Sequence, residues 1–160
     1  MSYLEENLNL KKELRFKNGK FRILCVSDFH GIVNFDRRLT RDLSAILDSA
    51  KPDLVLILGD TVWGDAAESP ESVEAFLKEV IPCIEDRKIP WAHVFGGHDD
   101  ERGITNEVQE KIYESFEYCL SKRGPADVSG VGNYVLPVKS SDGERIVYNV
   151  WGLDSHDNAG

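Results

Sequence analysis

The sequence is poor in cysteine, and its three cysteines are far apart. Cys25, Cys83 and Cys119 form no Cys-x-x-Cys pair, so a zinc or disulfide framework is disfavoured. The simplest interpretation is three reduced, mostly buried thiols in a cytoplasmic protein. We therefore look to other side chains for chemistry.

Positive charge and long apolar runs are also scarce. The chain has 19 Lys and Arg against 28 Asp and Glu, which gives a formal net charge of −9. Such a chain repels nucleic acid and anionic membranes, whereas it attracts cations. No apolar run approaches the ~20 residues that span a bilayer, and residues 1–12 are too polar and acidic for a secretory signal. We expect neither nucleic acid nor membrane as a partner.

Two common catalytic motifs are missing. The sequence contains no G-x-x-x-x-G-K-[ST], which excludes a P-loop, and no G-x-S-x-G, which disfavours an α/β-hydrolase nucleophile. A nucleotide- or flavin-binding domain would need a glycine-rich loop after its first strand. Asp28, Phe29 and His30 stand there instead, and a carboxylate at that point repels a phosphate unless a metal intervenes.

What is present is an alternation of strands and helices in 160 residues, the length of one domain. Continuous apolar runs predict buried strands, and apolar residues at helical spacing predict helices between them. This order implies an α/β fold with parallel strands and right-handed crossovers. The expected strands are 21–27, 54–58 and 91–95, and the expected helical stripes are 39–47, 73–84 and 108–120.

Local signals refine this picture. Asn18-Gly19 predicts a hairpin turn between 14–16 and 21–27, and a second hairpin is expected from 134–138 and 145–153. Ser69-Pro70 is typical of a capped helix start, and Pro82 should kink or shorten that helix.

Acidic, imidazole and glycine residues follow each of the three buried strands. Asp28 and His30 follow the first, Gly59-Asp60 the second, and Gly96-Gly97-His98-Asp99 the third. The carboxyl ends of parallel strands meet at one edge, where such folds bind ligands. Carboxylate and imidazole suit Mn, Fe or Zn, and on a regular strand Asp28 and His30 would share one side. The pattern predicts a divalent metal site.

These motifs, in this order, resemble the calcineurin-like metallophosphoesterase superfamily, whose signature is D-x-H, then G-D, then G-N-H-[DE]. Residues 14–16 and 153–155 are similar to its purple acid phosphatase-type branch. The resemblance covers 1–160 as a single domain. It implies part of a four-layer α/β/β/α sandwich with two metals at the sheet edge and a mixed sheet with helices.

The resemblance also implies residue roles. Asp28 and His30 would bind the first metal and Asp60 would bridge both. His98 would be the acid near the leaving group, with Asp99 orienting its ring. The reaction implied is two-metal phosphoester hydrolysis, in which the metals generate hydroxide and polarise the phosphoryl oxygens.

Two departures from the signature bear on activity. Gly97 stands where the family has an asparagine ligand, and the later histidine and G-H-x-H segment are absent, so the family's C-terminal part is expected to be lacking. His93 is interpreted as a core or surface residue of a strand, and His156 as a loop residue. The first metal then keeps three ligands and the second keeps only Asp60.

Two functional interpretations follow from this count of metal ligands. We expect a metal-dependent phosphoester hydrolase, impaired in this chain, with at best one metal. The alternative is a non-catalytic relative that acts through binding or self-association, since strands of an incomplete second sheet would expose an edge and favour a homo-oligomer or domain swap. Trp63 and Arg102 lie in loops that would set substrate specificity. Trp63 is either a stacking surface for an organic group or an ordinary exposed or core tryptophan, and Arg102 either pairs with phosphate or is merely solvated.

Overall fold

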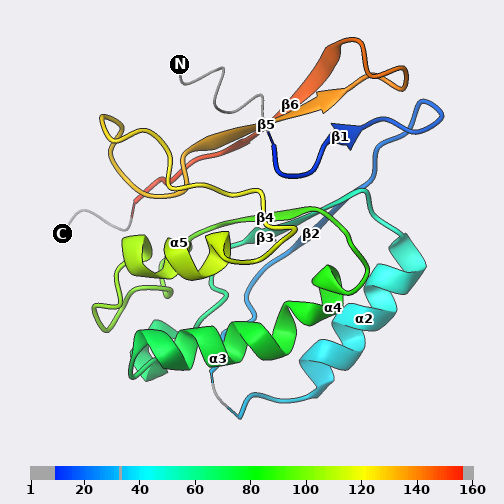
Figure 1. Ribbon diagram of the computed structural model, residues 1–160. Coiled ribbons are helices and arrows are strands. Elements are labelled where there is room, and N and C mark those ends of the chain that lie inside the picture. The colour runs from blue at the N-terminus through cyan, green and yellow to red at the C-terminus, as the bar shows by residue number, and fades with distance from the viewer. Residues whose placement is uncertain (1–9, 33, 157–160) are drawn as a thin grey trace.

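Two three-stranded sheets lie face to face, with helices covering one of them (Figure 1). The computed structural model describes residues 10–32 and 34–156. One sheet is parallel and has the order β2-β3-β4, while the other is mixed and has the order β1-β5-β6. The strands of the first are β2 Ile23–Val26, β3 Leu54–Leu58 and β4 Trp91–Val94, and those of the second are β1 Leu14–Arg15, β5 Tyr134–Lys139 and β6 Ile146–Gly152.

The helices lie on the face of the parallel sheet that points away from the second sheet (Figure 1). They are α2 Arg38–Ala50, α3 Pro70–Val80, α4 Pro82–Glu85 and α5 Asn106–Glu114, with a short 3-10 turn at η1 Gly64–Ala66. The start of α3 is as predicted, because the Ser69 side chain accepts the Ser72 N–H and Pro70 stands in the first turn. The break between α3 and α4 confirms the expected effect of Pro82, which has no N–H to donate.

Two apolar cores hold these layers together. The larger lies between the helices and the parallel sheet and includes Phe76, Leu77 and Trp91, all at most 1% exposed. The smaller lies between the sheets and includes Leu14, with Leu54, Tyr134 and Leu136. The described residues therefore form layers in the order α/β/β, which confirms the expected class as part of the four-layer sandwich. Among them, no helix is long and apolar enough to cross a membrane.

The predicted first hairpin is wrong, although its turn forms. Lys17 and Lys20 exchange backbone hydrogen bonds of 2.8 and 3.0 Å around Asn18-Gly19. The flanking strands then part, because β1 pairs with β5 and β2 pairs with β3. Burial of Leu14 in the core between the sheets accounts for the separation. The turn thus carries the chain from one sheet to the other.

Two other expectations need correction. The third helix ends at Glu114 instead of continuing to Leu120. Turns follow at residues 115–118, and the chain then runs beside β4, where Cys119 bridges Trp91 and the Leu120 N–H donates to the Trp91 carbonyl at 2.7 Å. The first apolar run is not buried on both faces, since β2 is an edge strand of the described sheet and Cys25 is exposed. Cys83 is half-buried and Cys119 is fully buried.

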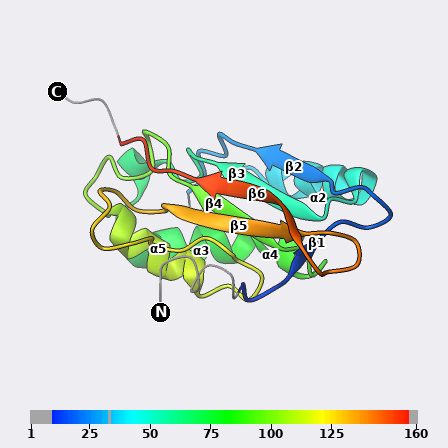
Figure 2. The same ribbon diagram turned by 90° about the horizontal axis from the view of Figure 1, so that it is seen from above.

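The second predicted hairpin is confirmed. β5 and β6 pair antiparallel from Tyr134–Gly152 to Lys139–Ile146. Seen from above, β6 lies at the edge of its sheet, and no described helix covers the outer face (Figure 2). Most of β6 is exposed, including Val147 at 48% and Trp151 at 58%.

The cysteines should differ in reactivity. Burial raises the pKa of the Cys119 thiol to about 12, so at pH 8 it stays protonated and unreactive. We expect iodoacetamide to modify Cys25 in the native protein and Cys119 only after unfolding, as measured by peptide mass spectrometry. Equal labelling of both thiols in the native state would contradict this burial pattern.

Candidate metal centre

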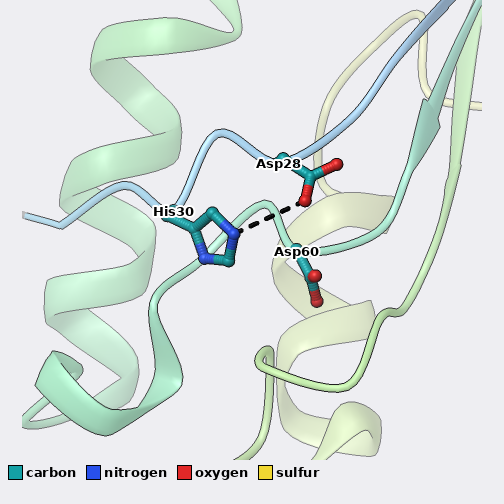
Figure 3. Close-up of side chains that lie close together, drawn as sticks. All are labelled: Asp28, His30 and Asp60. Carbon is teal, nitrogen blue, oxygen red and sulfur yellow. Dashed lines mark ion pairs between the residues drawn. The ribbon is translucent and has the colours of Figure 1, made fainter.

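Three of the predicted ligands come together at the carboxyl ends of β2 and β3. Asp28 and His30 follow β2, Asp60 follows β3, and one ligand atom from each lies within 4.8 Å of the others (Figure 3). The Asp28 Oδ1 to His30 Nε2 distance is 3.6 Å. It is the only such group of acidic, histidine or cysteine residues in the described chain. Two carboxylates and an imidazole fit Mn, Fe or Zn.

The backbone at these three residues is left-handed. The φ angles are +58° at Asp28, +43° at His30 and +51° at Asp60. Such values are uncommon outside glycine and cluster at functional sites. The expectation that Asp28 and His30 share one side of a regular strand is therefore wrong, because β2 ends at Val26. Their side chains meet through loop geometry instead.

Backbone hydrogen bonds hold the two loops together past the strand ends. The Asp28 N–H donates to the Gly59 carbonyl at 3.2 Å, and the His30 N–H donates to the Asp60 carbonyl at 2.9 Å. Gly31 continues the pattern by donating to Thr61 at 3.0 Å. The parallel pairing of β2 and β3 thus continues into the site and fixes the backbone positions from which the three side chains project.

Glycine is required where the loops after β3 and β4 touch. A Cβ atom at Gly96 would stand 2.2 Å from the Asp60 Oδ1 atom, and one at Gly59 would stand 2.7 Å from the Gly96 nitrogen. Gly59 also has a φ of +89°. Both contacts are shorter than any side chain allows, so these glycines let the loop after β4 lie against Asp60, a candidate metal ligand.

His98 lies beside the triad. The backbone N–H of His98 donates to Asp60 Oδ1 at 3.0 Å. Its half-exposed ring meets the His30 ring edge-on at a centroid distance of 5.3 Å. The His98 Nδ1 atom lies 2.6 Å from Glu101 Oε1. This hydrogen bond is the main reason why the pKa of His98 is raised, and it keeps the ring protonated to higher pH.

The orienting role expected of Asp99 is wrong, because Glu101 occupies the place beside the ring. Asp99 is 1% exposed, and its carboxylate accepts three backbone N–H groups instead. Burial raises the pKa of Asp99, while these hydrogen bonds oppose the shift. Sequence reasoning missed Glu101, although its spacing of three residues from His98 was the available signal.

The remaining candidates separate into core and surface. His93 is buried as interpreted, with its Nε2 2.9 Å from Glu110 and its ring stacked on Tyr113. Arg102 is exposed and pairs with Asp65 at 3.3 Å. Trp63 is also exposed. Neither Arg102 nor Trp63 is fixed in the core, and the loops that carry them flank the site.

Gly97 offers no side-chain ligand at the position where the family signature has an asparagine. Gly97 is exposed and lines a cavity of about 130 Å³. His156, in a loop as interpreted, lines the same cavity together with Asp154, Asp100 and Asn106. The Asp154 carboxylate accepts the Val131 and His156 N–H groups and so shapes its own loop. No described group of the required closeness forms a second metal site here.

Comparison with known proteins agrees with this geometry. A family model described as calcineurin-like phosphoesterase matches residues 21–158. "Phosphatase DCR2" of Saccharomyces cerevisiae is 35% identical over 158 residues, covering 86% of this chain and 27% of that protein. "Probable inactive purple acid phosphatase 14" of Arabidopsis thaliana is 30% identical over 160 residues, covering 86% of this chain and 39% of that protein. The chain thus spans less than half the length of either relative.

The contact of Gly96 with Asp60 generates a prediction. Gly96→Ala should displace the Asp60 carboxylate and weaken Mn²⁺ binding by about tenfold or more, as measured by calorimetry. Gly103→Ala is the control for backbone strain without a contact at the site, because Gly103 has a φ of +81° but a Cβ atom there would meet nothing within 4 Å. Equal Mn²⁺ affinity in both variants would show that the tight contact does not set the site.

Proposed function

The chain belongs to the calcineurin-like phosphoesterase family, and from that premise we propose that it is a metal-dependent phosphoester hydrolase whose activity is impaired. The observation that carries the proposal is the convergence of Asp28, His30 and Asp60 within 4.8 Å. Their left-handed backbone supports it, since such conformations persist at functional sites.

Each ligand residue has a role in the proposal. Asp28 and His30 hold a first divalent ion, Mn, Fe or Zn, and Asp60 turns a carboxylate toward it. When bound, such an ion acts as a Lewis acid and activates water near neutral pH. Three protein ligands with an open position match the composition of catalytic sites. A second ion would have only Asp60 among the predicted ligands.

His98 is the proposed general acid for the leaving group. Its ring is exposed beside His30, and Glu101 both fixes the Nδ1 atom and favours the protonated ring. With Nδ1 engaged, the Nε2 atom is the one left to face a substrate. A proton donor needs this combination of reach and orientation.

A cavity next to the loops that carry His30 and Asp60 is a candidate binding site for the organic part of the substrate. This cavity of about 350 Å³ is lined by Gly31, next to His30, and by Val62, close to Asp60. Val73 and Phe76 of α3 form apolar walls, with exposed Glu68 in the lining. The described residues of its lining include no Lys or Arg, which favours an uncharged or cationic organic group over a second phosphate. The reduced thiols and acidic charge favour a cytoplasmic location.

Metal binding and hydrolysis should fail together. Asp60→Asn should reduce both Mn²⁺ binding and hydrolysis of p-nitrophenyl phosphate or its diester by about tenfold or more. Asp86→Asn removes an exposed carboxylate before β4, at the opposite edge of the parallel sheet, and should change neither. A rate of hydrolysis that is unchanged both in Asp60→Asn and in the wild type after complete removal of metal would contradict the proposal.

A further variant, at Gly97, tests the proposed impairment in the same experiment. Gly97→Asn restores the side chain that the family signature places there, so it should raise the metal content above one equivalent and increase the rate. Elemental mass spectrometry after reloading gives the stoichiometry. Two equivalents in the wild type would show that Gly97 does not impair the site.

Strand β6 favours a second, non-catalytic candidate function. β6 is an edge strand whose seven residues carry no charge, and Val147, Tyr148 and Trp151 are about half exposed. Exposed apolar edge strands pair readily with other chains. Three relatives also carry the word "inactive" in their names. This candidate is a family member that self-associates through β6.

A lysine in β6 tests self-association. The wild-type chain should form dimers in sedimentation velocity, and Trp151→Lys should return it to the monomer because a charged edge resists strand pairing. Ala45→Lys adds the same charge on the exposed face of α2 and should leave the dimer unchanged. A wild type that is strictly monomeric would count against this function.

A further inference from the structure

We propose that Asp99 is a positioning residue that fixes the backbone of the metal ligand Asp60. The inference rests on the proposed function, because it assigns how that site is held. Asp99 does not touch the substrate or the ion. Its buried carboxylate accepts backbone donors from both the loop after β3 and the loop after β4.

Three backbone donors converge on this one carboxylate. Oδ2 accepts the Gly96 N–H at 2.7 Å and the Asp60 N–H at 3.0 Å, while Oδ1 accepts the Val62 N–H at 2.9 Å. An ionised carboxylate offers acceptors alone, so it can receive all three donors together. Hydrogen bonds to a charged acceptor are also stronger than those between neutral groups.

Asp60 needs such support because its own conformation is unfavourable. It lies past the end of β3 at Leu58 and has a φ of +51°. Its carbonyl is already bonded to His30, and its Oδ1 accepts the His98 N–H. The bond from Asp60 N–H to Asp99 fixes the remaining backbone group, and with it the direction in which the carboxylate leaves the chain.

Asp99 is itself anchored from the core. The Gln109 side chain of α5 is 0% exposed, and its Nε2 donates to the Asp99 carbonyl at 2.5 Å and to the Ile104 carbonyl at 2.9 Å. A buried helix residue therefore fixes Asp99, which in turn fixes Asp60. This chain of contacts runs from the helical layer to the metal site.

The test is the Mn²⁺ affinity of Asp99→Asn. An amide of the same shape offers one oxygen acceptor. With that oxygen in the Oδ2 position, its NH₂ group faces the Val62 N–H, and in the reverse orientation the Gly96 and Asp60 N–H groups both lose their acceptor. Either orientation leaves a buried backbone donor unpaired and replaces a charged acceptor with a weaker neutral one. We expect the Kd for Mn²⁺ to rise about 10–100-fold, the range for residues that support metal ligands. Asp86→Asn removes the same charge at an exposed position before β4, at the opposite edge of the parallel sheet from the ligands, and should leave the Kd within about twofold because exposed charges are screened.

Loss of stability must be separated from loss of positioning. Leu77→Ala empties part of the helical core, so it should lower the melting temperature without changing the Mn²⁺ affinity of the folded protein. Affinities are compared at a temperature where circular dichroism shows all variants folded. A second measurement covers the case in which Asp99→Asn does not fold. In the wild type, the Asp60 and Val62 amides should be protected from hydrogen exchange, since both donate to Asp99.

The outcomes distinguish the two proposals. Wild-type binding with an unchanged Kd in Asp99→Asn would overturn the positioning role and leave the metal site standing. Rapid exchange of the Asp60 amide in the wild type would overturn it as well. A wild type that binds no Mn²⁺ would overturn the proposed function, and the positioning role with it.

Discussion

The parallel pairing of β2 and β3 is the constraint on which the site depends. Four residue pairs join the strands, and three further hydrogen bonds continue the pairing beyond them. Ligands about 30 residues apart in sequence therefore start from backbone positions that are already matched. Each left-handed residue costs on the order of 1–2 kcal/mol, and a typical hydrogen bond contributes about 0.5–1.5 kcal/mol. The bonds across the loops thus offset a large part of the cost of this conformation.

Acidic side chains gather at this edge of the sheet. Asp28 and Asp60 face one point, Asp99 lies buried behind them, and Glu101 and Asp100 stand nearby. Like charges at such distances repel, and burial raises the cost for Asp99. Backbone N–H groups and the His98 ring offset part of the repulsion. A divalent ion would offset the rest, which gives a physical reason for metal binding that is independent of the family match.

Sequence reasoning located the site because it depended on topology. Apolar runs gave the strands, and the meeting of their carboxyl ends brought Asp28, His30 and Asp60 together. It could not foresee left-handed backbone at these residues, since that follows from contacts between loops. It also assigned Asp99 to the neighbouring ring, because burial and three backbone donors do not show in a local motif. The path of β1 was missed for the same reason, since Leu14 packs against residues more than 100 positions away.

That path of β1 sets an order of assembly. The Asn18-Gly19 turn sends β1 to a partner, β5, that begins only at Tyr134. During synthesis the metal ligands are complete at Asp60, and the loop carrying Asp99 and Glu101 follows soon after. β1 can pair only after most of the chain has been synthesised, and such distant contacts form slowly. The metal site and the helical layer can therefore assemble early, whereas the layer that closes the other face of the parallel sheet is completed last.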